Sequence, residues 1–118
     1  MAKKGKLRSL KSSAAFEQFV VDQLADLGEV MPKKMFGGVG LYCEGFFFGI
    51  VARDELYLKV DDSTREDYER AGAEPFKPYA DRSGTMQYYK VPLDVLESAP
   101  ELARWGRRAV GVARRSAR

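Results

Sequence analysis

The sequence contains no histidine and only one cysteine, Cys43. Histidine is the commonest general base and a usual ligand of catalytic zinc, so its absence removes the Ser-His and Cys-His catalytic pairs. One cysteine excludes an intramolecular disulfide and a site built on several cysteines, which favours a reducing, cytoplasmic setting. Glu44 disfavours a thiolate at its neighbour, so we expect Cys43 to be a small core residue. The chain is therefore predicted to be no enzyme and to hold no metal or cofactor.

Long apolar runs are also missing, and none reaches the length of a membrane span, so we expect no membrane contact. The glycine-rich run at residues 37–45 (GGVGLYCEG) falls where strands are predicted. No helix and no Gly-Lys-Ser/Thr ending follows it, which excludes a phosphate-binding loop. With 118 residues, 45% of them hydrophobic and 31% charged, the chain has the profile of a single globular domain.

The net charge of +3 is unevenly distributed. Residues 1–11 hold five basic side chains and no acid, residues 101–118 hold six arginines and one acid, and the central part carries −7. We predict a basic, flexible arm over residues 1–11 and one domain over residues 12–118. The basic ends form the electrostatic footprint of a nucleic-acid binder, although helix dipoles and solvation also favour such charges. The candidate nucleic-acid contacts are Lys3, Lys4, Lys6, Arg8, Arg104, Arg107, Arg108, Arg114 and Arg115.

Three segments have helical patterns. Apolar residues from Phe16 to Leu27 recur at helical spacing and predict a helix capped by Ser12 or Ser13 and closed by Gly28. A short helix is expected over residues 64–71, with Tyr68 and Ala71 buried. After a helical turn opened by Pro92, a last helix is expected to begin at Pro100. Its predicted buried face consists of Leu102, Trp105, Ala109 and either Val112 or Ala113.

Residues 34–60 have the pattern of a three-stranded meander that Pro32 separates from the first helix. A turn at Glu44-Gly45 would pair Tyr42 with Phe47 and Gly40 with Gly49, and a bulge is expected at Gly37-Gly38. The second loop is either residues 53–55 or residues 54–55, and the two choices give opposite faces to the next strand. We favour the longer loop, which stacks Leu56 and Leu58 on Ala52 and Ile50.

The remaining segments complete the expected topology. Residues 74–79 are too rich in proline for a central strand and suit an edge strand or an extended connection, residues 81–84 a turn, and residues 85–91 a strand. The order is then helix, three strands, helix, two strands, helix. The turns of the meander are too short for parallel crossovers, so we predict a two-layer α+β fold with helices packed on an antiparallel sheet.

Aromatic side chains occur on both predicted faces of the sheet. Tyr42, Phe47 and Tyr57 are expected to share one face, joined by Tyr88 or Tyr89, and to lie opposite Leu41, Phe48 and Ile50. Such a sheet is covered on both sides, dimerises, or stacks on nucleic-acid bases. Because the acidic central part repels phosphates, we predict that Tyr42, Phe47 and Tyr57 form a surface for a protein partner or a homodimer. A small-ligand pocket on this face is a third interpretation.

Several stretches together resemble the N-terminal domain of the TfoX/Sxy family of competence regulators. They are residues 34–40 (KMFGGVG), Gly45, residues 48–49 (FG), 55–59 (ELYLK), 75–76 (PF), 86–89 (MQYY), 91–92 (VP) and 102–105 (LARW). The match covers about residues 14–114. It implies an α+β fold similar to that of secretion chaperones and a role in transcriptional control of DNA-uptake genes, in which full-length members assist a cyclic-AMP-responsive activator.

The resemblance carries over no catalytic or ligand-binding residue. Full-length regulators have a second, helical domain, and we expect this chain to be a single-domain member without it. The sequence thus predicts a cytoplasmic, non-enzymatic regulatory domain that contacts the transcription machinery or an activator, with weak DNA contacts from the arginine-rich helix. The alternative is direct nucleic-acid binding through both basic ends. Salt dependence separates the two hypotheses, because phosphate contacts weaken steeply with added salt and an apolar protein interface does not.

Overall fold

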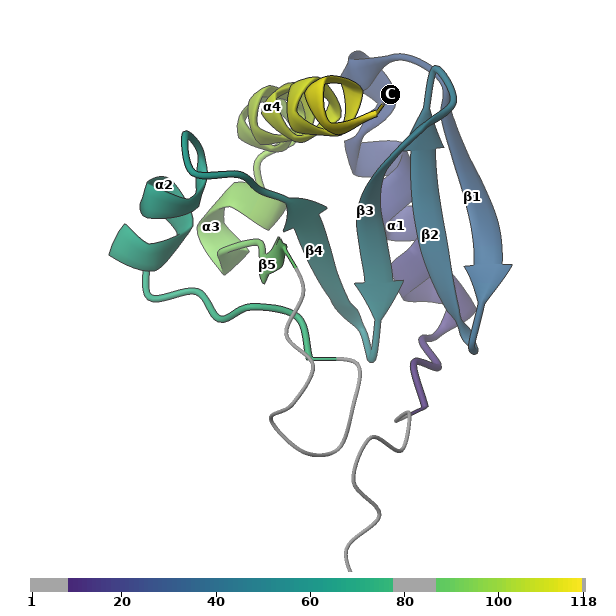
Figure 1. Cartoon of the computed structure of the whole chain (residues 1–118). Coiled ribbons are helices and arrows are strands. Elements are labelled where there is room, and N and C mark those ends of the chain that lie inside the picture. Colours follow the sequence, from purple (N-terminus) through teal and green to yellow (C-terminus); the bar gives the residue numbers. More distant parts are fainter. Residues whose placement is uncertain (1–8, 78–86, 118) are drawn as a thin grey trace, which may run out of the picture.

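The computed structural model describes residues 9–77 and 87–117. A five-stranded antiparallel sheet in the order β1-β2-β3-β4-β5 carries helices α1 and α4 on one face (Figure 1), so the predicted α+β class is confirmed. The strands are β1 (Val30–Met35), β2 (Gly38–Cys43), β3 (Phe46–Ala52), β4 (Glu55–Lys59) and β5 (Tyr88–Lys90). The helices are α1 (Ala14–Gln23), the 3-10 turn η1 (Ala25–Leu27), α2 (Arg65–Arg70), α3 (Leu93–Leu96) and α4 (Ala99–Ser116).

The distribution of strands differs from the predicted order. Four strands precede α2 and one follows it, because the segment interpreted as the first strand is a hairpin of two strands. Pro75 makes an isolated bridge to Tyr89, so residues 74–77 of the proline-rich segment are an extended connection with one bridge. The turn predicted at residues 81–84 and the start of the strand predicted at residue 85 lie outside the described residues.

Pro32 does not separate α1 from the sheet; it lies inside the edge strand β1. Phe36 and Gly37 form a two-residue turn with φ of 51° and 89°, so the bulge predicted at Gly37-Gly38 is wrong. In such a hairpin the pair next to the turn is hydrogen-bonded and the pairs then alternate. By this alternation the Pro32–Leu41 pair is not hydrogen-bonded, and the position without an N–H faces the outer edge. Proline therefore costs no hydrogen bond to β2.

Phe36 is the most strained exposed residue of this hairpin, since its φ of 51° is disfavoured for any residue with a Cβ and its side chain is 67% exposed. We expect Phe36→Gly to raise the free energy of unfolding by about 0.5–1 kcal/mol, the relief of left-handed strain less the added entropy of the unfolded chain. Urea denaturation of both proteins measures the difference. A loss of stability would instead show that the exposed ring makes a contact that outweighs the strain.

The hairpin between β2 and β3 begins as predicted and then shifts. Glu44 and Gly45 form its turn with φ of 55° and 83°, and Tyr42 lies opposite Phe47. Between Leu41 and Tyr42 the register shifts, so Gly40 lies opposite Ile50 and the predicted pairing of two glycines is wrong. Phe48 is the extra residue of this bulge, and its side chain is fully buried under the helices.

Neither predicted loop between β3 and β4 is correct. Arg53 and Asp54 form the turn, with φ of 52° and 60°, and Ala52 pairs with Glu55. Leu56 and Leu58 consequently lie on the helix side of the sheet, and Ile50 and Tyr57 lie on the other. The turn is fixed from outside the meander. The Asp54 N–H donates to the Ser12 hydroxyl (2.9 Å), and the Ser13 N–H donates to the Asp54 carboxylate (2.8 Å).

The helix signals were largely correct. Ser13 and Ser98 cap α1 and α4 by accepting from Phe16 N–H and Glu101 N–H, and α3 follows Pro92 as expected. The first helix breaks at Leu24 into η1 rather than continuing to Leu27. In α2 Tyr68 is buried as predicted, but Ala71 is exposed. Of the predicted buried face of α4, Leu102, Ala109 and both Val112 and Ala113 are buried, whereas Trp105 is half-buried against the core.

The sheet is covered unequally on its two faces. The helix-side core contains Val20, Leu24, Leu41, Phe48 and Leu102 among others. A smaller cluster on the opposite face contains Leu10, Ile50, Tyr57, Phe76 and Tyr88. Leu10 falls in the segment predicted to fray, yet it is 1% exposed, donates its N–H to Phe36 O and accepts from Arg53 N–H. The folded body therefore includes residues before α1.

Candidate functional site

Three arginines of α4 form ion pairs with carboxylates from other parts of the fold. Arg108 reaches Asp67 of α2 at 2.7 Å, Arg114 reaches Glu44 in the β2–β3 turn at 2.8 Å, and Arg115 reaches Asp61 after β4 at 2.9 Å. Arg104 pairs with Glu101 one turn earlier in the same helix at 2.7 Å. Arg107 differs, because among the described residues it has no ion pair and donates a 3.5 Å hydrogen bond to the Asp26 carbonyl. Three of the basic groups of α4 are thus neutralised by acids of the central part of the chain.

These pairs are electrostatically consistent. The hydrogen bond from Arg108 lowers the pKa of the Asp67 carboxyl, and that from Arg104 lowers the pKa of Glu101. Exposed ion pairs contribute little stability individually, up to about 1 kcal/mol. Their larger effect is to lower the positive electrostatic potential at the surface of α4. A guanidinium that is already bonded to a carboxylate is less available to a phosphate. The predicted contacts Lys3, Lys4, Lys6 and Arg8 lie outside the described residues.

Asp61 has the most depressed pKa among these acids, at about 2 against an ordinary value of 3.8. The first cause is the hydrogen bond from the Ser63 hydroxyl (2.6 Å), followed by that from Arg115. Because the folded-state pKa is the lower one, the stabilisation is present above about pH 4 and is lost as the pH falls through about 2. Acid below that range should loosen the contact between α4 and the end of β4.

We expect Ser63→Ala and Arg115→Gln each to raise the pKa of Asp61, because the hydrogen bonds from the serine hydroxyl and from the guanidinium both stabilise the ionised carboxylate. Titration of the Asp61 carboxyl carbon by NMR measures both shifts. Ser116→Ala is the matched control, since that hydroxyl donates to the Val112 carbonyl and not to Asp61. Equal pKa values in the wild type and the Ser63→Ala variant would contradict the assignment.

A row of aromatic rings crosses the sheet face opposite the helices. The rings of Tyr42 and Phe47 are stacked with centroids 5.0 Å apart and planes 22° apart, and Phe47 lies 5.5 Å from Tyr88. Lysines stand at both ends, with Lys33 Nζ 5.0 Å from the Tyr42 centroid and Lys59 Nζ 5.0 Å from the Tyr88 centroid. Burial raises the pKa of Tyr88 to about 12. We call Met31, Lys33, Tyr42, Phe47, Lys59 and Tyr88 the Tyr42 face.

Of the three residues predicted to form an aromatic surface, two remain partly accessible and one is buried. Tyr42 and Phe47 are half-buried neighbours, but Tyr57 is 8% exposed and packs under Phe76, with ring centroids 4.9 Å apart. Tyr88 rather than Tyr89 joins the row, since Tyr89 packs on the helix-side core. Met31, paired with Tyr42 and 51% exposed, was not predicted. The alternation of Met31 and Lys33 indicates a strand with both side chains on one face. That pattern is overlooked if the first strand is taken to begin after Pro32.

Other chemistry-bearing residues have structural positions. Cys43 is buried, and burial followed by the nearby Glu44 charge raises the pKa of its thiol, so it is a core residue as predicted. Within residues 9–77 and 87–117, no cluster of three acidic, cysteine or histidine side chains could hold a metal ion. In the same ranges, no helix is long and apolar enough to cross a membrane.

Comparison with known proteins agrees with this arrangement. The family model described as the TfoX N-terminal domain matches residues 22–113, from within α1 through all five strands into α4. The chain belongs to this family. The resemblance based on the glycine and aromatic stretches is therefore confirmed. Of the glycines in these stretches, Gly37 and Gly45 lie in β-turns, Gly38 and Gly49 lie beside another part of the backbone, and Gly40 lies against side chains.

One curated relative carries a functional name. It is the "DNA transformation protein TfoX1" of Aliivibrio fischeri, 29% identical over 96 residues. The aligned region is 80% of this chain and 45% of the relative, so the chain spans about half the length of that relative.

Proposed function

We propose that this TfoX-family chain is a non-enzymatic, cytoplasmic regulatory domain with a role in DNA transformation, and that it acts on transcription through contacts with another protein. Support comes from membership of the family and from the name of the Aliivibrio fischeri relative. The observation that carries the choice of a protein partner over DNA is the pairing of the α4 arginines. Arg108, Arg114 and Arg115 each bond a carboxylate from a different element of the fold.

Contact with phosphates through α4 would therefore have a cost. Each arginine would exchange an intramolecular carboxylate for a phosphate, and the freed Glu44, Asp61 and Asp67 would repel the nucleic acid. Counterion release favours binding only through cations that are not already neutralised. An interface that avoids these pairs and uses apolar surface has no such cost.

Direct nucleic-acid binding is the second candidate, and one observation favours it. Arg107 is exposed and has no ion pair among the described residues, where its hydrogen bond is to a backbone carbonyl, so it is the α4 arginine best placed to bind a phosphate. Titration of a labelled DNA duplex with the full chain at several salt concentrations tests this candidate. If the domain binds DNA, its affinity should fall steeply as salt is added, and this dependence should be smaller in Arg107→Gln. Arg104→Gln is the comparison variant.

The proposed function itself is tested in the organism that encodes the chain. Deleting the gene should lower both the transformation frequency and the transcripts of DNA-uptake genes, and the wild-type gene should restore them. Unchanged transformation and unchanged transcripts would overturn the role. Duplex DNA should show no steeply salt-dependent binding if the domain works through a protein.

A further inference from the structure

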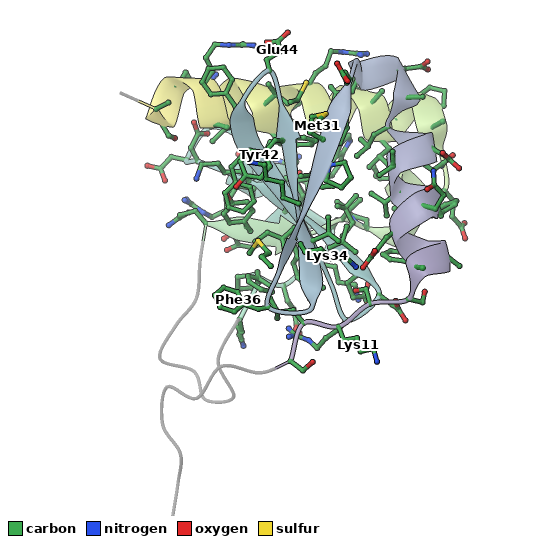
Figure 2. All side chains as sticks on the ribbon, turned by 90° about the vertical axis from the view of Figure 1, so that its right-hand side faces the viewer. Lys11, Met31, Lys34, Phe36, Tyr42 and Glu44 are labelled. Atoms are coloured by element: carbon green, nitrogen blue, oxygen red, sulfur yellow. The ribbon has the colours of Figure 1, made fainter. Side chains whose placement is uncertain are left out.

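The part of the sheet not covered by helices has both apolar and positive character. Met31 and Lys33 of β1 lie beside Tyr42 of β2, and in Figure 2 Tyr42 points away from α1 whereas Lys34 lies on the α1 side. Met31 is 51% exposed, and Tyr42 and Phe47 are half-buried. The Tyr42 face thus crosses the sheet from β1 to β5, and its β1 end is accessible.

The arrangement of the rings disfavours bases as ligands. Phe47 stacks on Tyr42 from the β3 side, and the Lys33 ammonium approaches the same ring from the β1 side. Tyr88 is 3% exposed, so its ring is also unavailable. Base stacking requires an open ring face, whereas this row leaves ring edges, a tyrosine hydroxyl and two ammonium groups for a ligand.

The charge on the Tyr42 face that has no partner is positive. Lys33 and Lys59 have no carboxylate partner among the described residues, whereas Lys90, on the same side of the sheet but outside the Tyr42 face, pairs with Glu55 at 3.2 Å. A second copy docked here would bring Lys33 and Lys59 against the same positive charges. An acidic partner complements them.

The outer edge of β1 limits how a partner can approach. Pro32 provides no N–H at the centre of this edge, and Lys33 and Lys34 follow it. Proline and lysine on an edge strand both disfavour the addition of another strand. The occupant should therefore lie across the Tyr42 face and not extend the sheet.

We propose that the Tyr42 face binds an acidic segment of a partner protein whose apolar side chains pack on Met31 and Phe47 and whose carboxylates bond Lys33 and Lys59. This inference rests on the proposed function, because it identifies the surface and the chemistry of the protein contact assumed there. It also revises the predicted partner surface, since Tyr57 lies beneath Phe76 and the lysines at the ends of the row become part of the site.

The binding test uses the full chain, labelled with ¹⁵N, and a synthetic peptide that alternates Glu and Asp with Leu and Phe. Amide shifts should concentrate on β1, β2, β3 and the Lys59 end of β4, and a counterpart with Lys at every acidic position should not bind. We expect Lys33→Gln and Lys59→Gln each to weaken binding about fivefold, the effect of losing one exposed ion pair. Lys34→Gln is the matched control, because Lys34 lies on the same strand but pairs with Glu17 of α1 at 3.7 Å, and its affinity should be unchanged.

Several results would overturn the inference. They are shifts centred on another surface, equal affinity for the lysine peptide, tighter binding of oligo(dT) to the same amides, or a concentration-dependent dimer in sedimentation that protects these amides. A strain carrying Lys33→Gln and Lys59→Gln separates this result from the proposed function. If deletion lowers transformation and the double variant does not, the role in transformation stands and the assigned surface is wrong.

Discussion

Replacing Phe48 with alanine should lower the free energy of unfolding by about 3–5 kcal/mol, the usual cost of truncating a fully buried phenylalanine. Phe48 has no exposed surface and lies in the helix-side core with Leu41 and Leu102. It is also the residue that the bulge adds to β3, so its neighbours in the chain are fixed by the pairs on either side. The core therefore has little freedom to collapse into the space left by the ring.

Phe36→Ala provides the matched control, because the same atoms are removed from a side chain that is 67% exposed. Its effect should stay within about 0.5 kcal/mol, as for most surface substitutions. Urea denaturation of the two variants and the wild type measures the difference. A small loss in Phe48→Ala, similar to that in Phe36→Ala, would show that the bulge releases its extra residue and that the sheet adopts the regular register.

The features that the sequence predicts correctly depend on nearby residues. Serine before a helical pattern caps α1, proline in the first turn begins α4, and Glu44-Gly45 forms a hairpin turn. Each follows from backbone requirements within about four residues. The α+β class followed as well, because short turns between strands allow only antiparallel neighbours.

The incorrect predictions share a non-local cause. Ser12 and Ser13 form hydrogen bonds to Asp54 in the turn from 42 and 41 residues away, and no residue near the turn in the sequence predicts this. Pro32 reads as a separator locally, yet it fits the outward position of an edge strand. The bulge at Phe48 places that side chain in the core under the helices, and no turn preference nearby in the sequence predicts it.

In the candidate sites, too, the local features were predicted correctly and the non-local ones were not. The sequence identified the arginines of α4 but not their partners Glu44, Asp61 and Asp67, which come from three other elements. It paired Tyr42 with Phe47 correctly, because the turn between them is local. It placed Tyr57 beside them, but the shifted register and Phe76 bury that ring. Charge pairing and covering segments are tertiary properties, so composition alone overstates what a surface offers to a ligand.

Gly38→Ala should be the most disruptive single-methyl addition in the sheet, with an expected loss of about 3 kcal/mol or more, the upper range for overpacking. A Cβ at Gly38 would lie 2.5 Å from the Val51 carbonyl oxygen and 2.8 Å from that of Leu10. Both are backbone atoms and cannot move aside as a side chain can. The segment that carries Leu10 is itself fixed by its hydrogen bonds to Phe36 O and Arg53 N–H.

Gly45→Ala separates this collision from backbone strain. Gly45 has φ of 83°, and no atom lies within 4 Å of the place that an added methyl group would take, so its variant should lose only about 1–2 kcal/mol from the left-handed conformation. In Gly38→Ala, the Arg53 amide should also exchange its hydrogen faster, because the added methyl pushes away the segment that carries Leu10. Equal losses in the two variants with no change at Arg53 would contradict the collision. The sheet requires glycine at position 38 because another part of the backbone passes beside it, and not because two glycines lie opposite each other across a hairpin.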